Sequence, residues 1–264
     1  IGEGTNWLDV VTRPGSINSH QLSFSGGNEN MRYAIIGNYF NNKGIVENTN
    51  FNRYGLRLNL DNDVLNDRLT ISSSWSFNRT NSNNAPTDRG GPGGIIITAL
   101  GLDPTVPVRD ENGEYALASY DGRFFTNPLQ ELVNVADMDA TNRVLGNTSF
   151  TFKIIEGLNF KTSIGADVID ASRTTFYPVG ISRLGRDRAG SLTKANLNSI
   201  NILNENILSY NRQFNENHSI DVVAGYTFQK EVNEEVSATN WGLSAVKVDQ
   251  AMLDGGTSVQ IPSS

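Results

Sequence analysis

The sequence predicts an all-β chain: a segment of about eight strands from an antiparallel transmembrane β-barrel with long extracellular loops. Three observations support this fold class. Apolar residues recur at every second position over most of the chain, which is the period of a strand. The composition is rich in turn residues, with 25 glycines and 8 prolines. The links between the alternating segments are short and long in turn, which is typical of bacterial outer-membrane barrels.

The composition also excludes several classes of protein. With 38% hydrophobic residues the chain is too apolar to be disordered, and no run of about 18 apolar residues indicates a transmembrane helix. The absence of cysteine excludes disulfides, cysteine-ligated metals and a cysteine nucleophile. A net charge of -7 predicts no nucleic-acid partner. The start at Ile1 shows no signal-peptide pattern, so we expect a removed signal or an internal piece of a longer protein.

The clearest alternation lies in residues 69–80. Leu69, Ile71 and Trp75 share one face of this expected strand, whereas serine, threonine and asparagine occupy the other. The same split recurs along the chain and predicts eight strands, at about 19–26, 31–41, 53–60, 69–80, 143–154, 158–168, 198–212 and 220–229.

The links between these strands predict two different rims. Short links are expected at 26–30, 61–68, 155–157 and 215–217, and long ones at 42–50, 81–142, 170–197 and from 231 to the end. Since antiparallel neighbours place alternate links at opposite ends, the short turns should share one rim and the long loops the other.

The two faces of the sheet predict their surroundings. A soluble sandwich or barrel also alternates, but it should expose many charges on its second face. Here the second face is mostly serine, threonine and asparagine, which favours an apolar face toward lipid and a polar face toward a wet lumen. Aromatic residues near the strand ends would form interfacial girdles; they are Tyr39, Phe40, Tyr54, Trp75, Phe77, Tyr210, Tyr226 and Phe228.

The stretch from His20 to Asp61 resembles the start of the barrel in SusC/RagA-type TonB-linked (TonB-dependent) outer-membrane proteins of Bacteroidota. The matching elements are SGG at 25–27, YF at 39–40, GI at 44–45 and FNRYGLRLNL at 51–60. TNWLDVV at 5–11 resembles the segment where the plug domain of this family leads into the barrel. Residues 208–231 resemble a later hairpin of the same barrel.

This resemblance implies active import across the Gram-negative outer membrane. Members form a plugged barrel of about 22 strands, couple to the TonB complex and carry a SusD-like surface lipoprotein as a lid that captures glycans or peptides. The chain shows no plug, TonB box or signal peptide, so we expect a barrel fragment that would reach the TonB complex only through the missing plug region. The expected parts are a plug-to-barrel linker at 1–17, a partial barrel at 18–231 and an extracellular loop segment at 232–264. The alternative is a stand-alone small outer-membrane barrel or a surface adhesin.

No residue pattern predicts an enzyme, a cofactor or a metal site. The two histidines, His20 and His218, have no carboxylate at the spacing of a catalytic triad or a metal site, so each is expected in the lumen or at a rim. Asp61–Asp67 lacks the glycine and glutamate of a calcium loop, and Gly90–Gly94 lacks the lysine of a phosphate-binding loop.

Two groups of loop residues are candidate contacts with the substrate or the lid. The loop at 81–142 contains Tyr115, Tyr120, Phe124 and Phe125, which either pack the loop together or stack on a partner. The loop at 170–197 contains Arg183, Arg186 and Arg188, followed by Lys194. This basic group either binds anionic groups of a substrate or lipopolysaccharide, or is simply solvated.

Overall fold

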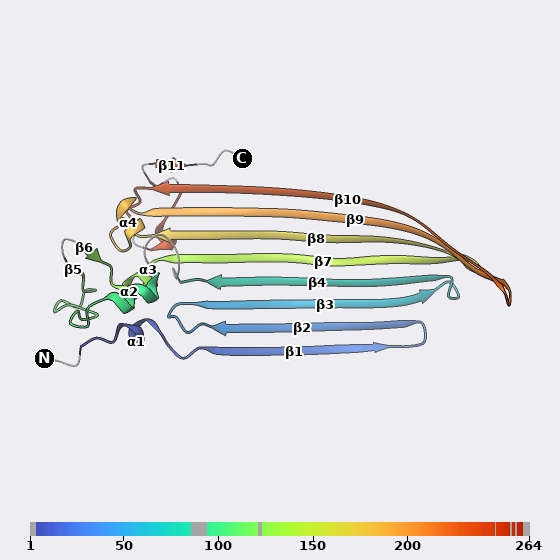
Figure 1. Cartoon of the computed structure of the whole chain (residues 1–264), viewed down its shortest axis with the longest axis horizontal. Coiled ribbons are helices and arrows are strands. Elements are labelled where there is room, and N and C mark those ends of the chain that lie inside the picture. Colours follow the sequence, from blue (N-terminus) through green and yellow to red (C-terminus); the bar gives the residue numbers. More distant parts are fainter. Residues whose placement is uncertain are drawn as a thin grey trace.

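One antiparallel sheet dominates the computed structural model, which describes residues 4–85, 94–120, 123–245, 247–253, 255–256 and 258–260. Its nine strands follow the order β1-β2-β3-β4-β7-β8-β9-β10-β11 (Figure 1). The long strands are β1 Ser16–Gly27, β2 Met31–Lys43, β3 Asn50–Val64, β4 Leu69–Asn83, β7 Ala136–Ile155, β8 Leu158–Tyr177, β9 Ser191–Asn215 and β10 His218–Trp241. β11, Ser258–Gln260, adds three residues beside β10. The prediction of eight strands in an antiparallel sheet is confirmed.

Several strands extend further than the alternation indicates. β7 begins at Ala136 rather than at Arg143, and β10 continues past Glu231 to Trp241. The loop expected at 81–142 is therefore confined to 84–135, and the segment expected as a loop from 232 begins as strand. In these extensions, ADMDATN and VNEEVSATN, the alternation continues but is weak, because the positions on the apolar face are mostly small residues and include Glu234.

The remaining elements gather at one end of the sheet, where the long connections lie, and the short turns lie at the other end (Figure 1). These elements are α1 Trp7–Val11, α2 Ile95–Gly101, β5 Ala118–Tyr120, β6 Arg123–Phe125, α3 Pro128–Asn134, α4 Arg183–Asp187 and the 3-10 turn Val248–Gln250. Among the described residues, no helix is long and apolar enough to cross a membrane. The predicted separation into a turn rim and a loop rim is confirmed.

The strand register separates an apolar face from a polar one. Directly paired residues of an antiparallel sheet point to the same side. Leu58 pairs with both Ile35 and Trp75, so these apolar side chains share one face across three strands. Ser72 pairs with Asp61 and with Ser149, and these residues belong to the opposite face. The apolar face continues over the sheet through Leu22, Phe24, Tyr33, Leu56, Phe77, Val144, Phe150, Phe160, Ile164, Ile200, Leu208 and Tyr226.

Polar groups on the apolar face satisfy one another. Ser73 and Thr148 share a hydrogen bond of 2.6 Å between their hydroxyl oxygens, and Trp75 Nε1 donates to Thr148 Oγ1 at 3.0 Å. Asn206 Nδ2 donates to Asn204 Oδ1 at 2.7 Å. Such pairing is what a lipid-facing surface requires, because hydrocarbon offers these groups no partner.

The strands are staggered as in a barrel wall. Leu69, the first residue of β4, pairs with Phe152, so β7 continues beyond β4 to Ile155. Leu158, the first residue of β8, pairs with Tyr210, so β9 continues beyond β8 to Asn215. A stagger that accumulates in one direction is the shear that tilts the strands of a closed barrel.

Candidate functional site

An aromatic and cationic cluster lies on the polar face near the loop rim. Phe40 pairs directly with Arg53, and Asn42 pairs with Phe51, so all four side chains share this face. The rings of Phe40 and Phe51 meet edge to face with centroids 6.0 Å apart, and the guanidinium carbon of Arg53 lies 5.6 Å from the centroid of Phe40. We call Phe40, Phe51 and Arg53 the mouth cluster.

The mouth cluster corrects one assignment made from the sequence. Phe40 was expected in an outward girdle together with Tyr39. Successive side chains of a strand point to opposite faces, so Tyr39 and Phe40 cannot both face outward. Tyr39 stays on the apolar face, where it contacts Tyr54 at 5.2 Å between ring centroids.

A cavity of about 360 Å³ opens beside Phe51. Its lining is rich in amides and hydroxyls and consists of Asn42, Gly44, Thr49, Asn50, Phe51, Ser82, Asn83, Asn84 and Ala85. Asn84 Nδ2 donates to Asp139 Oδ2 at 2.7 Å. Neutral donors and acceptors around one aromatic ring can hydrogen-bond and stack on a polar, uncharged ligand.

Two arginines on the polar face pair with carboxylates of the neighbouring strand. Arg173 forms two parallel hydrogen bonds with Asp137, at 2.9 and 2.7 Å, and lies 3.7 Å from Asp139. Further from the loop rim, Arg143 and Asp167 form a second bidentate pair at 2.8 and 2.7 Å. Bidentate pairs fix side-chain geometry, so these two pairs hold β7 and β8 in register toward the loop rim.

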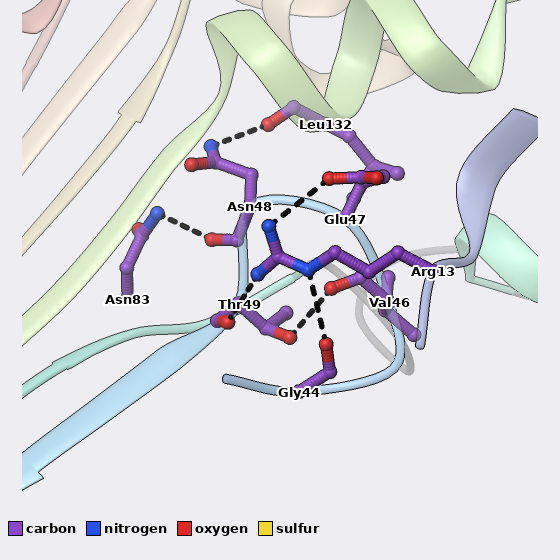
Figure 2. Close-up of polar contacts among 8 residues, drawn as sticks. All are labelled: Arg13, Gly44, Val46, Glu47, Asn48, Thr49, Asn83 and Leu132. Atoms are coloured by element: carbon purple, nitrogen blue, oxygen red, sulfur yellow. Dashed lines mark hydrogen bonds and ion pairs between the residues drawn. The ribbon is translucent and has the colours of Figure 1, made fainter. Parts of the chain in front are cut away.

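Arg13 ties the segment before β1 to the connection between β2 and β3 (Figure 2). Its guanidinium donates to the carbonyl oxygens of Gly44 at 3.2 Å and Thr49 at 2.9 Å, and it pairs with the carboxylate of Glu47 at 3.2 Å. Backbone hydrogen bonds run alongside, from Arg13 to Ile45 and from Glu47 to Val11. Residues 4–15 therefore pack into the loop rim. Their role as a linker from a plug domain to the barrel stays a prediction.

The same connection also holds the long loop. Asn48 Nδ2 donates to the carbonyl oxygen of Leu132 at 2.7 Å, and Asn83 Nδ2 donates to that of Asn48 at 2.6 Å (Figure 2). Asn48 adopts a left-handed backbone with φ of 60°, which asparagine tolerates better than most residues. The segment before β1, the long loop and the end of β4 therefore all contact the connection between β2 and β3.

An apolar core holds the loop rim together from within. This loop cluster has the buried residues Trp7, Val11, Ile95, Ala99, Leu102, Ala118 and Leu132. Asn127, itself buried, caps α3 by accepting from the backbone of Leu129 and Gln130, and its amide donates to the carbonyls of Val108 and Ala116. Burial raises the pKa of Glu131 on α3, against the hydroxyl bond from Thr126 and the positive charge of Arg186.

The structure describes the side chains of two of the four predicted aromatic contacts. Phe125 packs against the loop cluster, and Tyr115 lies beneath Arg109, whose guanidinium carbon is 4.2 Å from the ring centroid. Tyr120 and Phe124 belong to the hairpin of β5 and β6, but their side chains fall outside the described part of the structure. The positions of Phe125 and Tyr115 favour packing, and contact with a substrate or lid stays a prediction.

The predicted basic group lies on and after α4. Arg186 and Arg188 are exposed, and the guanidinium carbon of Arg188 lies 4.8 Å from the ring centroid of Trp241. The side chain of Arg183 is outside the described residues, and Lys194 belongs to β9. Most of the glycine-rich stretch, residues 90–93, is likewise outside them.

Neither His20 nor the acidic residues that the structure describes form a metal site. His20 stacks on Tyr39, with ring centroids 6.3 Å apart and an interplanar angle of 9°. It pairs in register with Tyr39 and so lies on the apolar face, not on the face predicted to line the lumen. Over the residues that the structure describes, no group of three or more histidines, cysteines or acidic residues could hold a metal ion.

An exposed apolar patch on α2 was not identified from the sequence. Ile97 and Leu100 are 60% and 63% exposed, while Ile95 and Ala99 on the same helix enter the loop cluster. Alternation at every second position does not mark a short helix inside a loop. Large exposed apolar side chains at a loop rim indicate a contact surface.

Comparisons with known proteins agree with this architecture. A scan against protein-family models finds none that matches. The TonB-dependent receptor P3 of Formosa agariphila is 31% identical over 98% of the chain, and the TonB-dependent receptor SusC of Bacteroides thetaiotaomicron is 27% identical over 65% of it. The chain spans 26% and 19% of these two relatives, about a quarter or less of their length.

The comparison with solved structures finds the same fold. The solved structure titled as the RagAB peptide transporter superposes with a TM-score of 0.76 at 17% identity, covering 98% of this chain and 30% of that one. The RagAB peptide importer in its open-open state gives a TM-score of 0.77. The two-faced, sheared sheet with its loop rim has the architecture of part of such a barrel. In sequence and in fold the chain therefore matches a segment of the barrel of SusC/RagA-type TonB-dependent receptors.

Proposed function

We propose that this chain forms part of the wall and mouth of an outer-membrane importer for oligosaccharides or peptides, energised by the TonB complex and working with a SusD-like surface lipoprotein. The observation that supports this most strongly is the division of one sheet into an apolar and a polar face, with every long connection at the same end. Such a wall would meet outer-membrane lipid on one side and a hydrated path on the other. The relatives named as TonB-dependent receptors and the neighbour titled as a peptide transporter support the same role.

The mouth cluster and the cavity beside it are the proposed substrate contact. Substrate would pass by exchange of hydrogen bonds along serine, threonine and asparagine side chains, because Arg143 and Arg173 of the polar face already pair with carboxylates. Phe51 borders the cavity and offers a ring for stacking, and Arg53 on the same face is exposed.

Replacing Phe51 with alanine in the full-length transporter tests this contact. We expect the substrate concentration for half-maximal uptake to rise about fivefold to tenfold, since an aromatic contact contributes about 1–1.5 kcal/mol. The matched control is Phe24→Ala, which removes the same ring from the opposite face. Equal uptake by the Phe51 variant and wild type, with normal amounts of folded barrel, would remove Phe51 from the substrate path.

The lid lipoprotein would dock on the loop rim, with the α2 patch as its apolar contact. Tyr115, Tyr120, Phe124, Phe125, Arg183, Arg186 and Arg188 remain proposed contacts with the lid or the substrate. We expect the double replacement of Ile97 and Leu100 by aspartate to reduce co-purification of the lipoprotein at least tenfold, because charges would enter an apolar interface.

The control for this experiment is Glu111→Ala, an exposed position in the turn before Tyr115. The barrel should assemble normally in both variants, because loop residues contribute little to the hydrogen bonding of the sheet. Unchanged recovery of the lipoprotein with the aspartate variant would place the lid elsewhere.

A further inference from the structure

A hollow lies on the apolar face of the sheet, on the side opposite the mouth cluster. Its volume is about 710 Å³, and it crosses β1, β2, β3, β4 and β7. Its lower lining is apolar, from Leu22, Leu56, Phe77 and Val144. Leu22 lies on β1, the edge strand of the described sheet, and is 62% exposed. We call this feature the outer groove.

Gly37 creates the outer groove. In the strand register it lies directly between Leu22 of β1 and Leu56 of β3. A Cβ atom at Gly37 would meet no atom within 4 Å, so the space above this glycine is open. A gap therefore opens over β2 at Gly37, between Leu22 and Leu56 on the neighbouring strands and between Ile35 and Tyr39 along β2.

The rim of the outer groove nearer the loops is aromatic and cationic. His20 stacks on Tyr39, and Tyr39 contacts Tyr54, so three rings line this edge. Beyond Phe77 on the same strand is Arg79, which is exposed and donates from Nη1 to Asn142 Oδ1 at 3.1 Å. The outer groove is thus amphiphilic, with an apolar floor and a polar edge toward the loop rim.

We propose that the outer groove binds one acyl chain of a phosphorylated outer-leaflet lipid, with the phosphate of that lipid beside Arg79. The apolar face faces hydrocarbon in the proposed outer-membrane location, so a lipid chain is the occupant that this location supplies. The position of a cation at the end of the groove nearer the loops matches an anionic headgroup of the outer leaflet. This proposal rests on the membrane location of the proposed function.

The other charged groups near the rim are consistent with this assignment. Asp170 of β8 pairs in register with Asn142 and shares its face; it accepts from Asn142 at 3.2 Å and lies one strand further from the groove than that asparagine. Arg143 borders the hollow with part of its chain, but its guanidinium pairs with Asp167 on the polar face. Arg79 is therefore the cation on the groove side of this edge among the described residues that line it.

The test uses the full-length transporter, purified in detergent and titrated with lipid A, and native mass spectrometry counts the lipids bound. Gly37→Trp fills the gap and should reduce lipid A binding at least tenfold. Arg79→Gln should weaken binding of phosphorylated lipid A about fivefold to tenfold and leave dephosphorylated lipid A unaffected. Ile200→Trp, which adds the same ring elsewhere on the apolar face, is the control and should bind as wild type does.

Each outcome decides the matter. Equal lipid A binding by a folded Gly37→Trp variant and wild type would overturn the proposal. A Gly37→Trp variant that changes its oligomeric state but still binds lipid A would overturn it too. An Arg79→Gln effect that is the same for both forms of lipid A would overturn the phosphate assignment. Substrate uptake, measured separately in cells, should be unchanged by Gly37→Trp, so a failure of lipid binding and a failure of the proposed transport role are distinguishable.

Discussion

Replacing Leu58 with arginine is expected to destabilise the folded barrel of the full-length transporter by about 2–4 kcal/mol. Leu58 lies between Ile35 and Trp75 on the apolar face, and all three side chains would meet hydrocarbon. A guanidinium at this position would lose its hydration without gaining a partner. Unfolding by denaturant in lipid vesicles, followed by heat-modifiable migration on gels, measures the loss.

Ser72→Arg is the matched control for this experiment. Ser72 lies on the polar face, where it pairs in register with Asp61. A new arginine there would remain hydrated beside a carboxylate, so the loss of stability should be far smaller. A loss at Ser72 as large as that at Leu58 would show that the two faces are assigned the wrong way round.

Replacing Trp7 with alanine is expected to unfold the loop cluster and leave the sheet intact. Trp7 is 2% exposed in the centre of that cluster, and truncation of a buried tryptophan costs about 3–5 kcal/mol. Its Nε1 is buried without a hydrogen-bond partner among the described residues, so the loss should fall near the lower end of this range. Limited proteolysis should show new cleavage within residues 94–135, whereas heat-modifiable migration should be unchanged.

Ile97→Ala controls for the loss of a large apolar side chain from the same rim. Ile97 is exposed, so this change should leave the cleavage pattern as in wild type. Resistance of the Trp7 variant to protease would mean that the hydrogen bonds of Arg13 and Asn127 hold the loops without the apolar core.

The alternation in the sequence predicted the sheet well because lipid and water impose opposite demands on its two sides. Leu58, Trp75 and their neighbours follow the expected faces wherever the strand crosses the apolar band. In the continuation of β10, Glu234 interrupts the apolar row of Val232 and Val236, and the prediction ended the strand at Gln229 although it reaches Trp241. Hydrogen bonding with β9, rather than side-chain burial, sustains this part of the strand.

The candidate site was harder to predict than the sheet. The parity of Phe40, Phe51 and Arg53 could have placed them on the polar face, but only the register shows that β2 and β3 bring them together. The outer groove depends on Gly37 lying between Leu22 and Leu56 in neighbouring strands, which no pattern within one strand reveals. Aromatic residues of the long loop could be recognised as important, but not whether they face inward.

The hydroxyl pair of Ser73 and Thr148 also constrains the order in which the barrel assembles. The two residues belong to β4 and β7, which are separated in sequence by residues 84–135. In the proposed membrane location each hydroxyl would enter hydrocarbon at a cost if alone, which favours association of the two strands before this part of the wall is inserted. On this route the chain closes its longest connection, with the associated loss of entropy, while still at the aqueous surface. Contacts within the loop cluster that bring the ends of this connection together would then speed insertion, although they lie outside the membrane.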